Sequence, residues 1–372
     1  MNPDLISKYF KKFVNYIPSV FESYDTSRVI ILQFALSGLD LLNRIDDLSE
    51  QDKNEIIDWI YDLQIFNSRS GRLEGFRGGF FPSNRDLKNQ IYMSGHVTMT
   101  YSCLVCLMIL GDDLSRVDKT GVLESFKNLQ NSEDGCFCAA LDCPEADVRF
   151  IFSALASCAI INDFSTVDVD AVVSFILRCQ NYDGGFGQRP REESHGGSTY
   201  CAIASLKILS KLNVFFPENS NNKNIMLRWL INRQYEGFHG RPHKDDDSCY
   251  TFWIGASLKM LGYGQLIDFP SLFDFIESTY EKLAGGFCKL KNTGHSFADP
   301  MHTYLCLAGI SSLIDDCKSN SNSNLHNSRT ISMAANQLIE ILQPLEPSLN
   351  VCKKRIENLS TENETSLSIL RL

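Results

Sequence analysis

A glycine-phenylalanine motif recurs along the chain and constrains its fold more than any other feature. The five copies are Gly78-Gly79-Phe80, Gly135-Cys136-Phe137, Gly184-Gly185-Phe186, Gly237-Phe238 and Gly285-Gly286-Phe287. Successive copies lie roughly fifty residues apart, a period typical of stacked supersecondary units. Between them lie two helical patterns, one amphipathic and one almost wholly apolar, as in Ser198 to Leu206. We therefore predict an all-α fold, an α-α barrel or toroid of repeated helix pairs, with apolar inner and amphipathic outer helices.

The domain organisation follows from the length and from the polar segments near the C-terminus. Repeat architectures and barrels often run to 372 residues as one unit, so we expect a single large domain over residues 1–345. A Ser/Asn-rich stretch predicts an insertion near 318–330, with a final helix near 331–342. Residues 346–372 are expected to form a polar C-terminal tail.

Net charge and cysteine content indicate which partners and which cellular compartment suit this chain. A formal net charge of −10 makes nucleic acid an unfavourable partner. The N-terminus has no signal-peptide hydrophobic region, and no apolar run reaches the length of a membrane span. Thirteen cysteines, an odd number without small-domain spacing, fit a reducing compartment in which most are small buried hydrophobes. We therefore expect a cytoplasmic protein without a transmembrane segment.

The segment from Gly240 to Tyr250 concentrates chemically active side chains. It reads Gly-Arg-Pro-His-Lys-Asp-Asp-Asp-Ser-Cys-Tyr and precedes an apolar helical run. Asp247 and Cys249 can hold a zinc ion if a third ligand comes from elsewhere, and Arg241 and Lys244 supply the positive charge that a diphosphate requires. A metal site beside an anion site indicates group transfer.

Aligning the apolar inner helices brings polar residues of five repeats to one position. The alignment uses Leu107, Cys158, Leu206, Leu258 and Leu313, and at the same distance upstream stand His96, Asp147, His195, Asp247 and His302. Equivalent positions in a closed ring point to the same rim, so these side chains are expected to converge around one mouth. Helix capping is the simpler interpretation for His96 and Asp147, because Asp is a favoured N-cap.

Several stretches resemble the β subunits of the protein prenyltransferases, and most closely those of the type I geranylgeranyltransferases, over nearly the whole chain. They are Phe34-Ala35-Leu36-Ser37-Gly38-Leu39-Asp40, Asp147-Val148-Arg149-Phe150, Ser194-His195-Gly196-Gly197-Ser198-Thr199, Gly240 to Tyr250, and Met301-His302-Thr303-Tyr304. The resemblance implies a zinc-dependent enzyme that transfers a geranylgeranyl group from geranylgeranyl diphosphate to the cysteine of C-terminal Cys-a-a-X motifs. It also implies an α subunit as partner in a heterodimer, and substrate proteins such as small GTPases.

Carried over by position, the resemblance assigns a metal site and a diphosphate site. The implied ligands of one zinc ion are Asp247, Cys249 and His302, and the implied diphosphate-binding residues are His195, Arg241, Lys244 and Tyr250. Three protein ligands leave a fourth zinc position for a substrate thiol. Lys289 matches a lysine of the type I enzymes where the farnesyl enzymes carry Asp, and its ammonium replaces a magnesium ion, so magnesium is expected to be dispensable.

Lipid and peptide selectivity are assigned in the same way. Ile30 and Leu305 stand where the resembling farnesyltransferases have a Trp and a Tyr, and the smaller walls leave room for a longer lipid. Arg149 matches a residue near the family's peptide site, and positions near the peptide or lipid pocket fall on Thr26, Phe34, Phe150 and Met301. Such a pocket favours Leu or Phe as the last residue of Cys-a-a-X.

Other interpretations of the same residues stay open. A lone His302 would be a core or capping histidine, Arg241 and Asp245 would be a surface ion pair of little weight, and Phe34 and Phe150 would be core. At the level of function the alternatives are a protein farnesyltransferase β subunit, a terpenoid-cyclase-like protein, for which the chain is short, and a purely structural ring.

Overall fold

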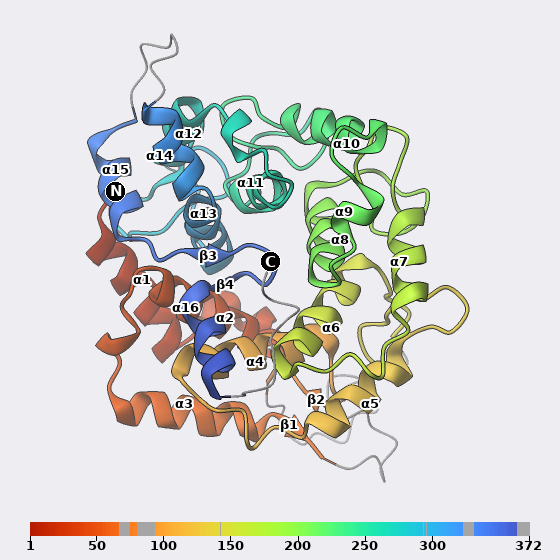
Figure 1. Ribbon diagram of the computed structural model, residues 1–372. Coiled ribbons are helices and arrows are strands. Elements are labelled where there is room, and N and C mark those ends of the chain that lie inside the picture. Colours follow the sequence, from red (N-terminus) through yellow and green to blue (C-terminus); the bar gives the residue numbers. More distant parts are fainter. Residues whose placement is uncertain are drawn as a thin grey trace.

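The computed structural model describes residues 1–66, 75–79, 94–141, 143–292, 294, 296–322 and 331–362, and within them a closed ring of helices (Figure 1). The inner helices are α2 (Arg28–Leu41), α4 (Val97–Leu110), α6 (Val148–Ile161), α8 (Gly196–Ile208), α11 (Tyr250–Met260) and α13 (Pro300–Ser312). Each packs against the next, and α13 packs back against α2. The outer helices are α1 (Pro3–Asn15), α3 (Glu50–Asp62), α5 (Lys119–Leu129), α7 (Val169–Arg178), α10 (Asn221–Ile231) and α12 (Phe269–Thr279). The predicted all-α toroid of helix pairs is confirmed.

Shorter elements connect and close this ring. The remaining helices are α9 (Leu212–Phe215), α14 (Ile314–Asn322), α15 (Met333–Ile341) and α16 (Lys353–Glu362), with 3-10 helices η1 (Ser19–Ser27), η2 (Ile45–Asp47) and η5 (Gly264–Leu266). Two antiparallel pairs join β1 (Gln64–Ile65) to β2 (Gly75–Phe76) and β3 (Leu345–Glu346) to β4 (Val351–Cys352). Helix α15 lies within the range expected for the final helix, but Lys318 to Asn322 continue α14, and the rest of the expected insertion lies outside the described residues.

Burial separates the two layers as the sequence pattern predicts. Helix α4 has no charged residue and is buried along almost its whole length, because it touches neighbours on every side. Helix α1 is amphipathic instead: it buries Tyr9, Phe10 and Phe13 and exposes Lys8 and Lys12. Removing these apolar surfaces from water is the main stabilisation of the ring.

The recurring glycine-phenylalanine motif is the joint between repeats. Its phenylalanine is fully buried and forms an antiparallel bridge to the end of the outer helix, as Phe186 does with Gln180. Gly184 has φ +95°, and an added Cβ there would lie 2.7 Å from the backbone of Ile225, so a side chain is excluded by both conformation and space. Gly285 approaches Leu5 of α1 in the same way, which joins the last repeat to the first. Phe80 of the first copy lies outside the described residues.

The segment after residue 345 differs from the expected tail. Residues 346–352 are largely buried inside the ring, where inner-helix tyrosines donate to their carbonyl groups: Tyr101 to Leu349, Tyr200 to Pro347 and Tyr304 to Asn350. Composition did not reveal this, because polar residues inside a ring can be satisfied by hydroxyl groups of distant helices. Residues 353–362 form α16, and 363–372 lie outside the described part.

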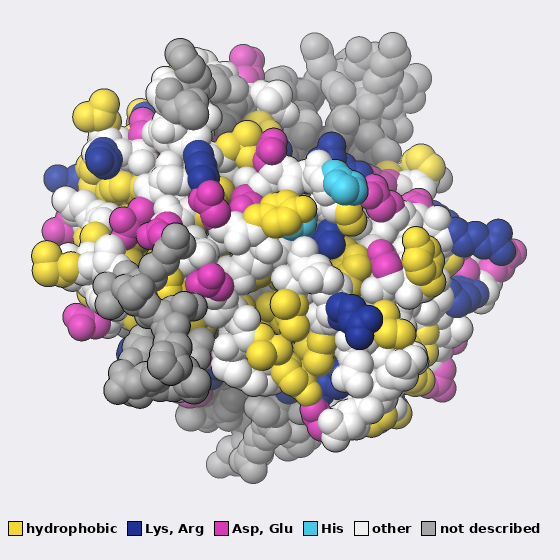
Figure 2. Space-filling view, turned by 90° about the horizontal axis from the view of Figure 1, so that it is seen from above, with side chains coloured by type: hydrophobic (Ala, Val, Ile, Leu, Met, Phe, Trp, Pro, Cys, Tyr) yellow, Lys and Arg dark blue, Asp and Glu magenta, His cyan; other side chains and the backbone are white. Residues whose placement is uncertain are grey.

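The outside of the ring combines charge with exposed hydrophobic groups. Figure 2, a view from above Figure 1, shows hydrophobic side chains gathered near the middle of this face and charged side chains of both signs around them. All thirteen cysteines lie in the described residues as free thiols, and all except Cys138 and Cys143 are buried. In the part of the chain that the structure describes, no helix combines the length and apolar character needed to cross a membrane.

Candidate metal and anion site

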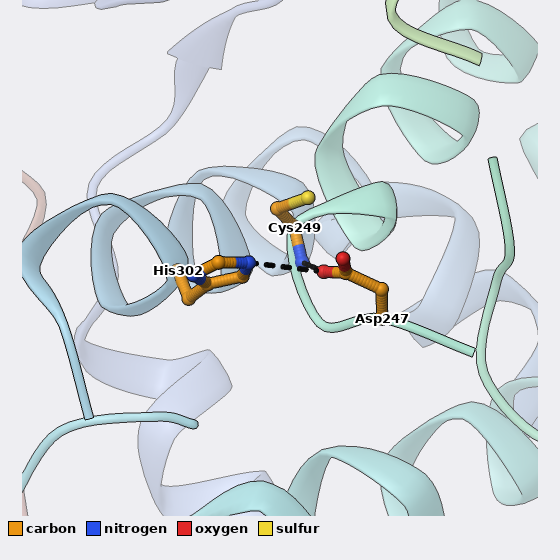
Figure 3. A group of neighbouring side chains, drawn as sticks. All are labelled: Asp247, Cys249 and His302. Carbon is orange, nitrogen blue, oxygen red and sulfur yellow. Dashed lines mark hydrogen bonds and ion pairs between the residues drawn. The ribbon is translucent and has the colours of Figure 1, made fainter. Parts of the chain in front are cut away.

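Asp247, Cys249 and His302 come together at the N-terminal ends of two neighbouring inner helices (Figure 3). Asp247 and Cys249 lie just before α11, and His302 lies in the first turn of α13. One carboxylate oxygen, the thiol sulfur and one ring nitrogen all lie within 4.8 Å of one another. All three residues are buried, with 5 to 7% of their surface exposed. Residues far apart in sequence thus form one compact donor set.

Local hydrogen bonds hold the segment that carries two of the three donors. The Asp247 N–H donates to the carbonyl of Phe238, the motif phenylalanine, and Oδ1 of Asp247 accepts from the N–H of Cys249 at 3.0 Å. Ser248 between them donates its N–H to the carbonyl of Lys289 and its hydroxyl to that of Cys288. The repeat joints therefore determine where the carboxylate and the thiol lie.

The three groups alter one another's protonation. Burial would lower the pKa of His302, but its hydrogen bonds to Asp247 and Asp299 outweigh burial and raise the pKa to about 9. Burial would raise the pKa of Asp247, but contacts with His302 and Cys249 hold it below its usual value. Burial, reinforced by the Asp247 charge, raises the pKa of the Cys249 thiol. The cluster is therefore an ionised Asp and His beside a neutral thiol.

This donor set fits a zinc ion. Carboxylate oxygen, thiolate sulfur and imidazole nitrogen are the ligand types zinc takes in proteins, and three protein ligands with an open position are typical of catalytic rather than structural sites. A cation between the groups would also remove the cost of burying Asp247 and would favour the thiolate of Cys249. The residues present thus match the implied metal.

His195, Tyr250 and Arg241 lie together beside this cluster. The hydroxyl of Tyr250 is 2.8 Å from Nε2 of His195, and Arg241 forms a 2.7 Å ion pair with Glu193 rather than with Asp245. Burial and then the Arg241 charge lower the pKa of His195. The charges of Arg149 and Asp247 also act on this pKa, which couples His195 to both neighbouring parts of the rim.

Lys244 and Lys289, two cations predicted to contact the diphosphate, both have exposed side chains. Lys244 lines a cavity of about 480 Å³ with Glu236 and Lys291, and its ammonium has no hydrogen bond or ion pair with the described residues. The ammonium of Lys289 lies 3.9 Å from Oδ2 of Asp247, and its side chain is 62% exposed. Lys289 therefore lies beside the cluster, whereas the cavity that Lys244 lines includes none of Asp247, Cys249 and His302.

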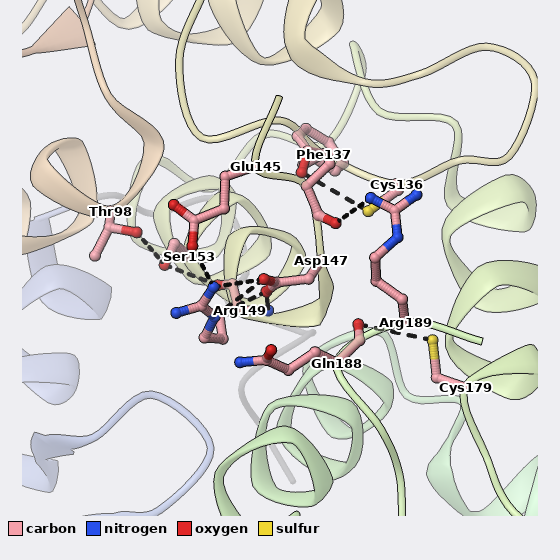
Figure 4. A network of polar contacts seen from close by, with 11 residues as sticks. Thr98, Cys136, Phe137, Glu145, Asp147, Arg149, Ser153, Cys179, Gln188 and Arg189 are labelled. Carbon is pink, nitrogen blue, oxygen red and sulfur yellow. Dashed lines mark hydrogen bonds and ion pairs between the residues drawn. The ribbon is translucent and has the colours of Figure 1, made fainter. Parts of the chain in front are cut away.

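Arg149 belongs to a polar network on the neighbouring part of the rim (Figure 4). Its guanidinium contacts both oxygens of Asp147, at 2.6 to 3.1 Å, and Oε1 of Glu145 at 2.6 Å. Arg189 donates to the carbonyl of Ala146, which supports the same turn. The guanidinium is thus held in one orientation at the start of α6.

The residues assigned to lipid and peptide lie on helices α2, α6 and α13 and on η1. Ile30 and Phe34 are half-buried on α2, and Leu305 is buried on the adjoining α13. Phe150 is buried on α6, Thr26 is half-buried in η1, and Met301 is 36% exposed at the start of α13. Within the described part of the chain, these positions lie on four separate elements and do not form one contact cluster.

A belt of aromatic side chains inside the ring was not predicted. Its contacts join Phe34 to Tyr304, Tyr101 to Phe152, Phe152 to Tyr200, and Tyr200 to Phe252 and Trp253, with ring centroids 4.8 to 5.8 Å apart. Most of these residues stand at a constant distance after the rim positions, so the same alignment of helices contained the signal.

The equivalence of the five rim positions needs a correction. His96, Asp147 and His195 are the N-caps of their helices, but Asp247 lies two residues before the N-cap of α11, and His302 lies inside α13. The N-cap of α13 is Asp299, which was not among the predicted residues although Asp followed by Pro300 is a typical helix start. Aligning on apolar anchors cannot locate a helix start to within a turn.

Comparison with known proteins agrees with this architecture and with the motif pattern. Residues 1–351 match the model of the prenyltransferase alpha-alpha toroid domain. The chain is 37% identical over 326 residues to the geranylgeranyl transferase type-1 subunit beta of Dictyostelium discoideum, covering 84% of this chain and 90% of that protein. It is 36% identical over 313 residues to the subunit of that name from Arabidopsis thaliana, with 80% of each chain covered.

A solved structure shares the fold. The Candida albicans protein geranylgeranyltransferase-I complexed with GGPP superimposes with a TM-score of 0.77, covering 97% of this chain and 99% of its own at 24% identity. The chain therefore belongs to the prenyltransferase α-α toroid family, and its relatives put it among the type-1 geranylgeranyl transferase β subunits. The prediction of a prenyltransferase enzyme is confirmed.

Proposed function

We propose that this chain is the catalytic β subunit of a zinc-dependent protein geranylgeranyltransferase. It transfers the geranylgeranyl group of geranylgeranyl diphosphate to the cysteine thiol of a C-terminal Cys-a-a-X motif, with X preferably Leu or Phe. One observation carries the proposal: a buried Asp247-Cys249-His302 donor set lies beside His195, Tyr250 and Arg241 at the same end of the ring. The site for the acceptor thiol would therefore lie next to the site for the diphosphate, as transfer of the lipid from one to the other requires.

Asp247, Cys249 and His302 would hold one zinc ion, with a fourth position free for the substrate. When bound, zinc lowers the pKa of a coordinated substrate thiol and so supplies a thiolate nucleophile near neutral pH. The burial of these residues excludes water from the nucleophile.

Five side chains on the anion side would bind and stabilise the diphosphate. His195 and Tyr250 hold each other in position, and Arg241, Lys244 and Lys289 contribute the positive charge. Negative charge grows on the diphosphate as the carbon–oxygen bond breaks, so these cations stabilise the transition state more than the ground state. The ammonium of Lys289 takes the place of a magnesium ion, and magnesium is therefore not required.

The lipid would lie inside the ring against Phe34 and Trp253, the half-buried members of the aromatic belt. Aromatic faces offer large apolar contact to an unsaturated chain. Ile30 and Leu305, on adjoining helices, leave more space than Trp and Tyr would, and this volume favours the longer donor. Thr26, Phe34, Phe150 and Met301 would complete the walls of the lipid and peptide pockets.

Arg149 would face the peptide, because its guanidinium is already oriented by Asp147 and Glu145. The acceptors would be Cys-a-a-X proteins such as small GTPases, in the cytoplasm. A prenyltransferase α subunit would complete the enzyme as a heterodimer. The exposed hydrophobic groups on the face in Figure 2 are compatible with a protein partner.

Metal analysis of the purified heterodimer tests the proposal. One zinc per β subunit, lost on Cys249→Ala, is expected together with alkylation of a Cys-a-a-Leu peptide by geranylgeranyl diphosphate. A structural ring or a terpenoid-cyclase-like protein would retain no such metal. A preference for farnesyl diphosphate with the same peptide would support the farnesyltransferase alternative.

A further inference from the structure

The carboxylate of Asp299 has two partners on one residue. Oδ1 accepts the backbone N–H of His302 at 2.9 Å, which makes Asp299 the N-cap of α13, and Oδ2 lies 2.5 Å from Nδ1 of the His302 ring. The other ring nitrogen, Nε2, lies 3.3 Å from Oδ1 of Asp247. The imidazole therefore lies between Asp299 on one side and the metal cluster on the other.

This arrangement determines which ring nitrogen faces the cluster. An ionised carboxylate only accepts hydrogen bonds, so the hydrogen of the Asp299–His302 contact lies on Nδ1. When the ring binds a metal as a neutral imidazole with its proton on Nδ1, Nε2 carries the free electron pair. Nε2 is the atom that faces Asp247. Asp299 thus selects the tautomer in which His302 can act as a ligand.

Capping alone does not require this second contact. Asp168, the N-cap of α7, accepts one backbone N–H, from Ala171 at 3.0 Å, and Ser332 caps α15 with a single hydroxyl oxygen. One oxygen is therefore enough to start a helix of this ring. Asp299 uses one oxygen for that purpose and has the other on His302.

The backbone around Asp299 is held from two sides. The N–H of Ala298 donates to Oε2 of Glu281 at 3.1 Å, and Ala298 forms an antiparallel bridge with Cys288. Cys288 in turn accepts, through its carbonyl, the hydroxyl of Ser248 between Asp247 and Cys249. The capping turn and the ligand segment are thus joined through one strand-like connection.

We propose that Asp299 is a positioning residue of the metal site, which orients the His302 ring and keeps Nε2 free to bind zinc. This inference rests on the proposed zinc site. Because hydrogen-bond partners of metal-bound histidines typically change metal affinity by about 10- to 100-fold, Asp299 is expected to matter within that range without touching the metal.

The test uses two substitutions of Asp299 that preserve the N-cap of α13. The same two substitutions are made at Asp168, the N-cap of α7, as a comparison. Asp299→Asn and Asp299→Ser both place a good N-cap residue, but the amide can donate to Nδ1 and select the wrong tautomer, and the Ser hydroxyl is too short to hold the ring. Asp168→Asn and Asp168→Ser are the matched controls. The full chain with its partner subunit is titrated with zinc against a chromophoric chelator, and separately with cobalt(II), whose absorption reports thiolate and imidazole ligation.

Both Asp299 variants should bind zinc about 10- to 100-fold more weakly than the wild type and show an altered cobalt(II) spectrum, whereas the Asp168 variants should be unchanged. Thermal unfolding of the metal-free proteins checks that all four variants fold. If the wild type binds zinc and both Asp299 variants bind it equally tightly, this inference is wrong but the proposed function still stands. A wild-type protein that binds no zinc overturns the proposed function, and this inference with it.

Discussion

The rim of the ring has two halves in which similar polar residues have different partners. At the starts of α4, α6 and α8, the side chains of His96, Asp147 and His195 accept backbone N–H groups of their own helices. At the starts of α11 and α13, Asp247 lies before the cap and His302 lies after it. A displacement of a few residues separates a side chain that caps a helix from one that joins the cluster of possible metal donors.

The difference lies in which atoms stay free. Nδ1 of His195 is occupied by the N–H of Gly197, so its Nε2 is left to the hydroxyl of Tyr250. His302 leaves capping to Asp299 and turns its Nε2 toward Asp247. Cys249 is the N-cap of α11 by position, yet its thiol makes no capping hydrogen bond. The side chains that do not cap a helix are thus the ones whose atoms are available to bind a metal.

The largest expected effect comes from removing a member of the cluster. Asp247→Ala, Cys249→Ala or His302→Ala should each abolish zinc binding and lower peptide alkylation by at least about a hundredfold, because a bound metal contributes several kcal/mol to the transition state. Binding of geranylgeranyl diphosphate should be largely unchanged. Metal content and single-turnover alkylation are the measurements, with Cys306→Ala, a buried cysteine of α13 outside the cluster, as control. Full turnover by a zinc-free variant would refute the assignment.

The second prediction concerns the two cations proposed to bind the diphosphate, Arg241 and Lys244. Arg241→Ala combined with Lys244→Ala should lower the single-turnover rate by about a hundredfold, since each lost donor weakens stabilisation of the departing diphosphate. Lys291→Ala, which removes a lysine of the same cavity paired with Glu236, should have little effect. Rapid-quench kinetics distinguishes a lower rate of the chemical step from weaker binding of the donor. An unchanged rate constant at saturating donor would contradict the proposed role of the two cations.

Lipid length should respond to volume inside the ring rather than to the rim. Ile30→Trp with Leu305→Tyr adds side-chain volume on the adjoining helices α2 and α13. It should shift preference from the geranylgeranyl toward the farnesyl donor by about 1 to 3 kcal/mol, roughly 10- to 200-fold. Competition between the donors on one Cys-a-a-Leu peptide measures this ratio. If the double variant keeps the wild-type ratio, these residues do not set lipid length.

The smallest effect concerns a capping residue and stability rather than catalysis. Burial lowers the pKa of His96 to about 4, against 6.5 for an ordinary histidine, so the unfolded chain takes up the proton first. The neutral His96 ring therefore contributes fully to the free energy of unfolding above pH 6.5, and this contribution is lost as the pH falls toward 4. The loss amounts to about 2 kcal/mol by pH 5. His96→Asn, which preserves a cap, should remove this part of the pH dependence. Urea unfolding of both proteins from pH 7 to 5 measures it, and parallel curves would show that His96 does not titrate this way.

Much of the fold and of the site was predictable because the signals are local or repeated. The glycine-phenylalanine period and the alternation of apolar and amphipathic helices predict the ring. The segment before Tyr250 together with Met301-His302 predicts the three side chains that the structure brings together. The cap of α13, the Arg241–Glu193 pair and the aromatic belt escaped prediction. Each depends on where a helix begins or on which side chains of separate repeats meet.

The sequence by itself determined the repeated helix pairs and the chemical types available at each rim position, because burial pattern and residue chemistry are properties of short segments. Only the tertiary structure decided which rim residues cap a helix and which face one another. Closing the ring brings α13 beside α11 and puts the His302 ring in contact with both Asp299 and Asp247. It also put residues 346–352 inside the ring, where tyrosines from three inner helices satisfy their carbonyl groups. Contacts between segments far apart in sequence arise from packing, and no local pattern encodes them.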